Sequence, residues 1–224
     1  MRLAKSCFDV GLMIDRCQFR LEDWTGIGLQ LDHVIEIEGF LQHRFNIDQA
    51  VLKVNVAIEP LADGPSSGLA WFAIHGKRFS LQDGSPVYCP DALVPAPARS
   101  VGGQGLDIEI ATPSPNNAIR FYSDVFGLEQ VDDATVRYGS ATIGFRTAAR
   151  PTLAIPLRGR GIRYLTFQVF DADAVCKDVE ARGGAVGRSP IDYGDVARYG
   201  FVLDPDGNWI EISARASVIA AYRN

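Results

Sequence analysis

The sequence predicts an α+β protein with two tandem domains, built from paired βαβββ modules that form curved mixed sheets. Three observations support this fold class. A Pro- and Gly-rich stretch at 90–105 separates two halves of the 224-residue chain. Apolar and polar residues alternate along short segments of both halves, and in the second half a capped helix follows the first strand of each module. Because each module leaves one sheet face uncovered, repeated modules are expected to pair.

The first module of the second half begins with a strand at 106–111 (LDIEIA), where apolar and acidic residues alternate. A helix is predicted at 115–126, because Ser114 is a suitable N-cap and Gly127 a suitable helix end. Two more strands follow, at 135–138 and 141–146.

The same order repeats from a strand at 162–170 (IRYLTFQVF). A helix at 173–182 follows, capped by Asp171 or Asp173 and closed by Gly183. The remaining predicted strands are 185–191, 196–203 and 209–213, the last entered through the turn DPDGN.

The first half begins with a strand at 8–14 and a weaker helix near Trp24. Strands at 34–38, 42–46 and 51–58 complete this module. The stretch that follows offers strands at 71–74, 78–82 and 87–89 without a helix signal. The predicted organisation is a degenerate N-terminal domain at 1–97 (module 7–58, shortened module 69–90), a linker at 98–104, a complete C-terminal domain at 105–215 and a tail at 216–224.

The amino-acid composition excludes some classes of binding partner and indicates a cellular location. Lys and Arg number 22 against 27 Asp and Glu, and the formal charge of -5 argues against nucleic acid or anionic membranes as partners. The four cysteines show no metal-site or redox spacing, and no segment resembles a secretory signal or a membrane span. A cytoplasmic location is expected, with a small-molecule ligand as partner and a homodimer as an open alternative.

Three motifs in one order carry a family resemblance. The run AIRFYSDVFGLEQV at 118–131, RYLTFQV at 163–169 and FVLDPDGNWIEIS at 201–213 resemble the vicinal oxygen chelate superfamily. This superfamily includes glyoxalases, bleomycin resistance proteins and extradiol dioxygenases. The likeness covers about 105–215, whereas the first half shares only the module pattern. It implies that paired modules form a cup around a small-molecule cleft.

The resemblance also implies a divalent metal held by side chains from the first and last strand of each module, usually His, Glu or Gln. The matching positions of the second half are Asp107, Tyr164, Glu211 and Gly144, and those of the first half are Asp9, Asn55, Trp71 and Tyr88. Glu211 is a usual ligand type and Asp107 an oxygen substitute. The family pattern therefore implies either a weakly bound metal on Glu211 and Asp107 or no cofactor.

Alternation independently places polar side chains on the face opposite the apolar one, where they would line the cup. Glu211, Asp107 and Tyr164 are the candidate catalytic residues. The candidate substrate-binding residues are Glu109, Thr166, Gln168, Trp209, Arg198 and Tyr193. A merely solvated sheet face would show the same alternation.

Two functions remain open from the sequence. The first is an enzyme of lyase, isomerase or ring-cleaving dioxygenase type, acting on a small oxygenated molecule in the C-terminal cup. In such an enzyme, paired carboxylates could bind a cation or act as general acid and general base. The second is a non-catalytic protein that sequesters a small molecule, as bleomycin resistance proteins do; a scaffold that binds nothing is a lesser third. His33 is interpreted as an ordinary structural histidine.

Overall fold

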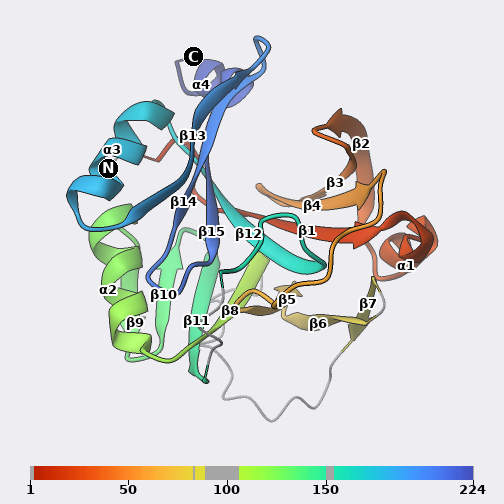
Figure 1. Cartoon of the computed structure of the whole chain (residues 1–224), viewed down its shortest axis with the longest axis horizontal. Helices are drawn as coiled ribbons and strands as arrows, with labels where there is room; N and C mark the ends of the chain where they lie inside the picture. Colours follow the sequence, from red (N-terminus) through yellow and green to blue (C-terminus); the bar gives the residue numbers. More distant parts are fainter. Residues whose placement is uncertain (1–2, 83, 89–105, 150–153, 224) are drawn as a thin grey trace.

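The computed structural model describes residues 3–82, 84–88, 106–149 and 154–223 (Figure 1). The first half contributes β1 (Asp9–Asp15), η1 (Arg16–Gln18), α1 (Leu21–Gly26), β2 (Gln30–Ile37), β3 (Phe40–Ile47), β4 (Ala50–Ala57), β5 (Leu69–Ile74), β6 (Lys77–Gln82) and β7 (Ser85–Tyr88). The second half contributes β8 (Leu106–Thr112), α2 (Pro115–Phe126), β9 (Glu129–Asp132), β10 (Thr135–Tyr138), β11 (Ala141–Thr147), β12 (Gly161–Gln168), α3 (Ala172–Ala181), β13 (Ala185–Tyr193), β14 (Ala197–Leu203), β15 (Trp209–Arg215) and α4 (Ala216–Arg223). We call β1–β4, β5–β7, β8–β11 and β12–β15 the first, second, third and fourth modules.

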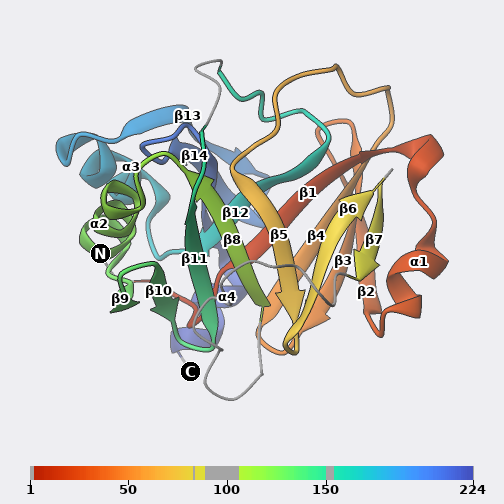
Figure 2. The same cartoon turned by 90° about the horizontal axis from the view of Figure 1, so that it is seen from below.

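Each of the two sheets takes one module from each half of the chain. The eight-stranded sheet has the order β13-β14-β15-β12-β1-β4-β3-β2, so it joins the fourth module to the first through antiparallel β1 and β12. The seven-stranded sheet, seen in front in Figure 2, has the order β7-β6-β5-β8-β11-β10-β9 and joins the second module to the third through antiparallel β5 and β8. Within three modules the first strand pairs in parallel with the last: β1 with β4, β8 with β11, and β12 with β15.

This topology confirms the α+β class with curved mixed sheets but corrects one expectation about the cup. The segment 105–215 does not form a cup by itself, because its two modules lie in different sheets. The free edge of β12 pairs with β1, and the free edge of β8 pairs with β5, so both edges are satisfied by the first half of the chain. The domain boundaries stay predictions, and the linker 98–104 lies outside the described residues.

The helices of the second half begin and end close to their predicted positions. Helix α2 spans the predicted 115–126 and stops at Gly127, which has the left-handed φ of 72° that favours glycine. Helix α3 lies within one residue of the predicted ends, and the Asp171 side chain accepts from the Ala174 amide as its N-cap. The second module has strands but no helix within its described residues, as expected.

Strand β9, helix α4 and the short η1 were not predicted. Strand β9 is exposed along its whole length and shows no alternation of buried and exposed residues. Helix α4 occupies the segment predicted to be a tail, and it follows β15 directly.

One hydrophobic core connects both sheets with the helices. Trp24 of α1 stacks on Phe45 of β3 and on Phe72 of β5, with ring centroids 6.1 and 6.5 Å apart. Phe126 of α2 stacks on Phe167 of β12 at 4.5 Å. Since apolar positions along the strands face this core, the residues between them face the opposite side of each sheet.

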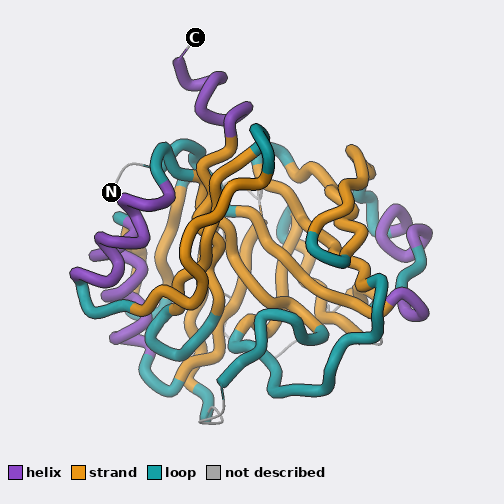
Figure 3. The backbone as a smooth tube through the Cα atoms, turned by 45° about the horizontal axis from the view of Figure 1, so that its top comes forward, coloured by secondary structure: helices purple, strands orange, loops and turns teal. Residues whose placement is uncertain are grey.

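The eight-stranded sheet is strongly curved. Figures 1 and 3 show β13–β15 and β2–β4 rising as two walls on either side of β12 and β1. Helices α2 and α3 lie outside this concave face (Figure 1). The concave face of this sheet is where a cavity forms.

Candidate functional site

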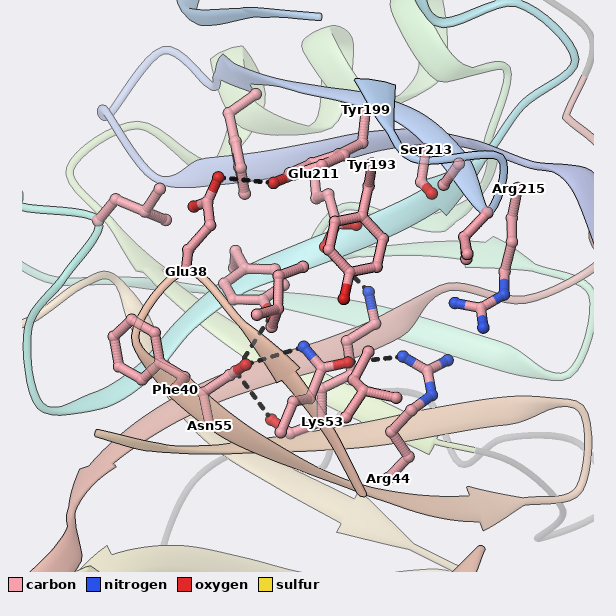
Figure 4. A pocket seen from close by; sticks show the side chains of 18 of the residues that line it. Glu38, Phe40, Arg44, Lys53, Asn55, Tyr193, Tyr199, Glu211, Ser213 and Arg215 are labelled. Atoms are coloured by element: carbon pink, nitrogen blue, oxygen red, sulfur yellow. Dashed lines mark hydrogen bonds and ion pairs between the residues drawn. The ribbon is translucent and has the colours of Figure 1, made fainter. Parts of the chain in front are cut away.

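A pocket occupies the concave face of the eight-stranded sheet, with an empty volume of about 750 Å³ that includes open solvent at its mouth. Its walls come from the first and fourth modules, so neither half of the chain forms it alone. Figure 4 shows polar side chains of both modules converging on it. Apolar and aromatic residues form part of the wall, namely Met13, Ile35, Ile37, Phe40, Leu157 and Phe201.

Strand alternation explains why charged residues reach this pocket. On β4, Leu52 and Val54 belong to the hydrophobic core, so Lys53 between them faces the pocket. On β15, Ile210 and Ile212 belong to the core, so Glu211 faces the pocket from the other module.

Lys53 and Glu211 meet at the base of the pocket. The Lys53 Nζ lies 2.9 Å from Glu211 Oε2 and donates to Thr166 Oγ1 at 2.7 Å. Thr166 Oγ1 in turn donates to the same Glu211 oxygen at 2.9 Å. The side chains of Lys53 and Glu211 are only 4% and 13% exposed. Burial lowers the pKa of Lys53, while the Glu211 carboxylate opposes that shift.

The two oxygens of Glu211 therefore have different surroundings. Oε2 accepts from both Lys53 and Thr166, whereas no described residue donates to Oε1. Because Glu211 lines the pocket, Oε1 is the oxygen that a bound molecule can approach. The arrangement places the carboxylate beside a cation and leaves one of its oxygens for a ligand.

Tyr164 lies beside this pair, and glycine makes room for it. A Cβ built on Gly11 would lie 2.1 Å from the Tyr164 ring, so only glycine permits the ring to lie across β1. Asn55 Nδ2 donates to the Tyr164 hydroxyl at 3.1 Å, and no described residue accepts a hydrogen bond from that hydroxyl. Burial raises the pKa of Tyr164, so its hydroxyl stays protonated and able to donate.

A chain of amides connects Tyr164 to a buried arginine. Gln42 Nε2 donates to Asn55 Oδ1 at 2.8 Å, and Arg44 donates to Gln42 Oε1 at 2.7 Å. These bonds fix the orientation of both amides, since each amide oxygen accepts and each amide nitrogen donates. Figure 4 shows the row of side chains from Asn55 to Arg44.

The rim joins the two modules directly. Arg188 of β13 forms a two-point ion pair with Glu38 in the β2–β3 turn, and the Tyr199 hydroxyl donates to the same carboxylate at 2.7 Å. The hydrogen bonds from Arg188 lower the pKa of Glu38. Tyr193 donates to the Glu36 carbonyl at 2.9 Å. The contacts close one side of the pocket.

Several candidate residues from the sequence are found here. Tyr164, Gln168, Glu211 and Tyr193 line the pocket, and buried Thr166 contacts the Lys53–Glu211 pair.

The other candidates do not reach the pocket. Asp107 and Glu109 lie on β8 of the seven-stranded sheet, so the expected convergence of Asp107 with Tyr164 and Glu211 is wrong. Asp107 accepts from the backbone and hydroxyl of Thr142, and Glu109 pairs with Arg146 at 2.9 Å.

Trp209 and Arg198 lie in the eight-stranded sheet that forms the pocket, but their side chains bind other parts of the protein. The Trp209 indole donates to the Ile155 carbonyl at 2.7 Å. Arg198 forms ion pairs with Asp173 and Asp192.

Sequence reasoning missed Lys53, Arg44 and Arg215, all of which line the pocket. Two of them come from the first half, which was expected to be a degenerate domain. A signal was present in the segment VLKVNVAI, where Lys53 and Asn55 interrupt an otherwise apolar strand at alternate positions. Such residues in a strand that is buried on both faces need a partner.

The side chains do not fit the divalent metal that the family pattern implies. Among the described residues, no three His, Cys, Asp or Glu side chains are grouped so as to hold a metal ion. Glu211 is the one carboxylate at the centre, and its Oε2 already accepts from the Lys53 ammonium at 2.9 Å. A second cation there would meet the charge of Lys53, so the pocket supplies its own cation.

The fold and this pocket define a class of protein. Residues 106–212 match the family model of the Glyoxalase/Bleomycin resistance protein/Dioxygenase superfamily, the family that the motifs of this segment predicted.

The whole chain is similar in fold to glyoxalase I from Zea mays. One crystal structure of that protein aligns with a TM-score of 0.61 and 11% identity, covering 96% of this chain and 94% of the other. A mutant of the same protein aligns with a TM-score of 0.64 and 10% identity, covering 94% of both chains. A comparison with curated protein sequences gives no match. No described helix has the length and hydropathy that a membrane span requires.

Proposed function

We propose that the protein is an enzyme of isomerase or lyase type that moves a proton on a small oxygenated organic molecule without a metal ion. The contact between Lys53 and Glu211, with Glu211 Oε1 left open to the pocket, carries this proposal. A carboxylate with one free oxygen can act as a general base on a carbon next to a carbonyl.

In this reaction Glu211 Oε1 takes the proton from the carbon, and the electron pair moves onto the carbonyl oxygen to give an enolate. Lys53 and the protonated Tyr164 hydroxyl would donate hydrogen bonds to that oxygen, because both line the same pocket. Returning the proton to the adjacent carbon completes an isomerisation. Loss of a leaving group from the enolate would make the protein a lyase instead. Ring cleavage by dioxygen is not favoured, since the donor set does not suit a redox metal.

Sequestration is the second candidate. The apolar and aromatic part of the wall, which includes Phe40 and Phe201, would bind an apolar ligand without reaction. A homodimer stays an open alternative under either function.

The test follows exchange of carbon-bound hydrogen with deuterium from solvent, by NMR, on a panel of small hydroxy- and keto-carbonyl compounds. Glu211→Gln should reduce exchange by about 100-fold or more, because it removes the base. Glu109→Gln is the matched control, since Glu109 is a buried, ion-paired carboxylate in the other sheet and its replacement should leave exchange unchanged.

The two candidates predict different results. Binding of panel compounds without exchange by the unmodified protein would support sequestration. Equal exchange by the unmodified protein and by Glu211→Gln would refute the assignment of the base.

A further inference from the structure

Two arginines at one end of the pocket, Arg44 and Arg215, form no ion pair with a described residue. Arg44 of β3 is 7% exposed, and it donates a hydrogen bond to the neutral Gln42. Arg215 at the end of β15 is half-buried, and no described residue accepts a hydrogen bond from it or forms an ion pair with it. Figure 4 shows the two guanidinium groups turned toward each other at one end of the pocket.

Three other arginines, by contrast, bind either a glutamate or backbone carbonyl groups. Arg163, which is 2% exposed, donates to the backbone carbonyls of Gly159, Pro65 and Arg160. Arg146 and Arg188 each pair with a glutamate. Arg44 and Arg215 therefore differ in their surroundings from these three arginines.

Two like charges at close range in a partly desolvated pocket repel each other. Burial lowers the pKa of Arg215, and the nearby charge of Arg44 lowers it further. The carboxylates of Glu211 and Asp9 oppose this shift, but each of them already pairs with a lysine. Lys53 is a third cation on the same wall, and the carboxylate of Glu211 already forms an ion pair with it. The charges that line this end of the pocket are thus in excess of the acids available to balance them.

A neighbouring polar group also lacks a partner. Gln168 lines the pocket and is 4% exposed, and its Oε1 is buried without a hydrogen-bond partner among the described residues. On the sheet, Gln168 lies opposite Ser213, which is midway between Glu211 and Arg215 on the same face of β15. An acceptor without a donor at this position suits a ligand that carries a hydroxyl group.

We infer that Arg44 and Arg215 form an anion subsite that binds the carboxylate or phosphate group of an acidic ligand. Paired guanidinium groups provide the forked donors that such oxyanions accept. Glu211 and Arg215 lie four residues apart on β15, about 13 Å along the strand, so the anionic group lies some way from the carbon that Glu211 reaches. This inference deepens the proposed function and rests on it for the identity of the pocket, but it does not require Glu211 to act as a base.

The test measures binding of malonate, inorganic phosphate and neutral malonamide by calorimetry and by thermal shift. The unmodified protein should bind malonate or phosphate and not malonamide, and added salt should weaken the binding. Arg44→Met and Arg215→Met should each weaken it by about 10- to 100-fold, the loss expected for a charge-assisted hydrogen bond. Arg146→Met, which removes an arginine of the other sheet, is the matched control and should bind as the unmodified protein does.

A second readout separates ligand binding from a structural role. Without ligand, Arg215→Met should keep or raise the melting temperature, since it removes repulsion by Arg44. Malonamide bound as tightly as malonate, or unchanged anion affinity in both pocket variants, would overturn the subsite. If Glu211→Gln abolishes exchange but keeps anion binding, both proposals stand. If anions bind and no compound exchanges, the subsite stands and the catalytic proposal fails.

Discussion

Replacing Lys53 with methionine tests the central ion pair most directly. Methionine keeps much of the side-chain volume but removes the ammonium that contacts Glu211 and Thr166. Because Lys53 is 4% exposed and Glu211 13%, the carboxylate would be left largely desolvated with only the Thr166 hydrogen bond. Breaking a buried pair typically costs 3–5 kcal/mol, and partial access of Glu211 to the pocket places this case near about 3 kcal/mol.

A loss of about 3 kcal/mol corresponds to a drop in melting temperature of roughly 6–12 °C for a chain of this size. Urea unfolding followed by tryptophan fluorescence would measure the free energy, since the chain contains three Trp. Lys77→Met is the control, because Lys77 is exposed on β6 and its loss should change the free energy of unfolding by no more than about 0.5 kcal/mol.

The double variant Lys53→Met with Glu211→Gln decides whether the pair is coupled. Removing both charges should restore most of the stability, so the double variant should be more stable than the sum of the single losses by about 2–3 kcal/mol. If the two single losses add to within about 0.5 kcal/mol, the residues do not form the pair described here and the reasoning is wrong.

Three further outcomes are expected. Gly11→Ala should destabilise the protein by about 1–3 kcal/mol, because the new Cβ would lie 2.1 Å from the Tyr164 ring. Thermal unfolding should show a smaller loss in a Tyr164→Ala background, and an equal loss would contradict the clash. Burial raises the pKa of Asp204 to about 6, so its contribution to the free energy of unfolding is greatest below about pH 4 and falls by about 3 kcal/mol as the pH rises through 6 to about 7. A carboxyl ¹³C titration of Asp204 with a midpoint below about 4.5 would refute this. Elemental analysis after dialysis should find far less than one divalent metal per chain, and a stoichiometric metal that Glu211→Gln removes would show that the pocket does hold one.

Local signals in the sequence predicted the elements of the second half well. The Pro and Gly residues around α2 and the aspartate before α3 act within one helical turn, so a single sequence reveals them. The alternation that predicted Glu211 and Tyr164 as polar-face residues is equally local.

The pairing of modules could not be predicted from the same signals. Alternation tells which face of β12 is buried but not which strand lies at its edge, and that neighbour proved to be β1 of the first half. Asp107 was therefore assigned to the wrong cup, and Lys53 was not considered as a partner for Glu211. Both errors have one cause, since the site depends on contacts between distant parts of the chain.

The antiparallel pairing of β1 with β12 also has a consequence for the order of folding. Gly11 pairs with Tyr164 roughly 150 residues later in the chain, and such distant contacts close slowly. During synthesis the edge of β1 stays unpaired until the fourth module has left the ribosome. In that interval the exposed edge of β1 can pair with the same edge of another nascent chain. A fragment that ends before β12 should therefore associate with copies of itself.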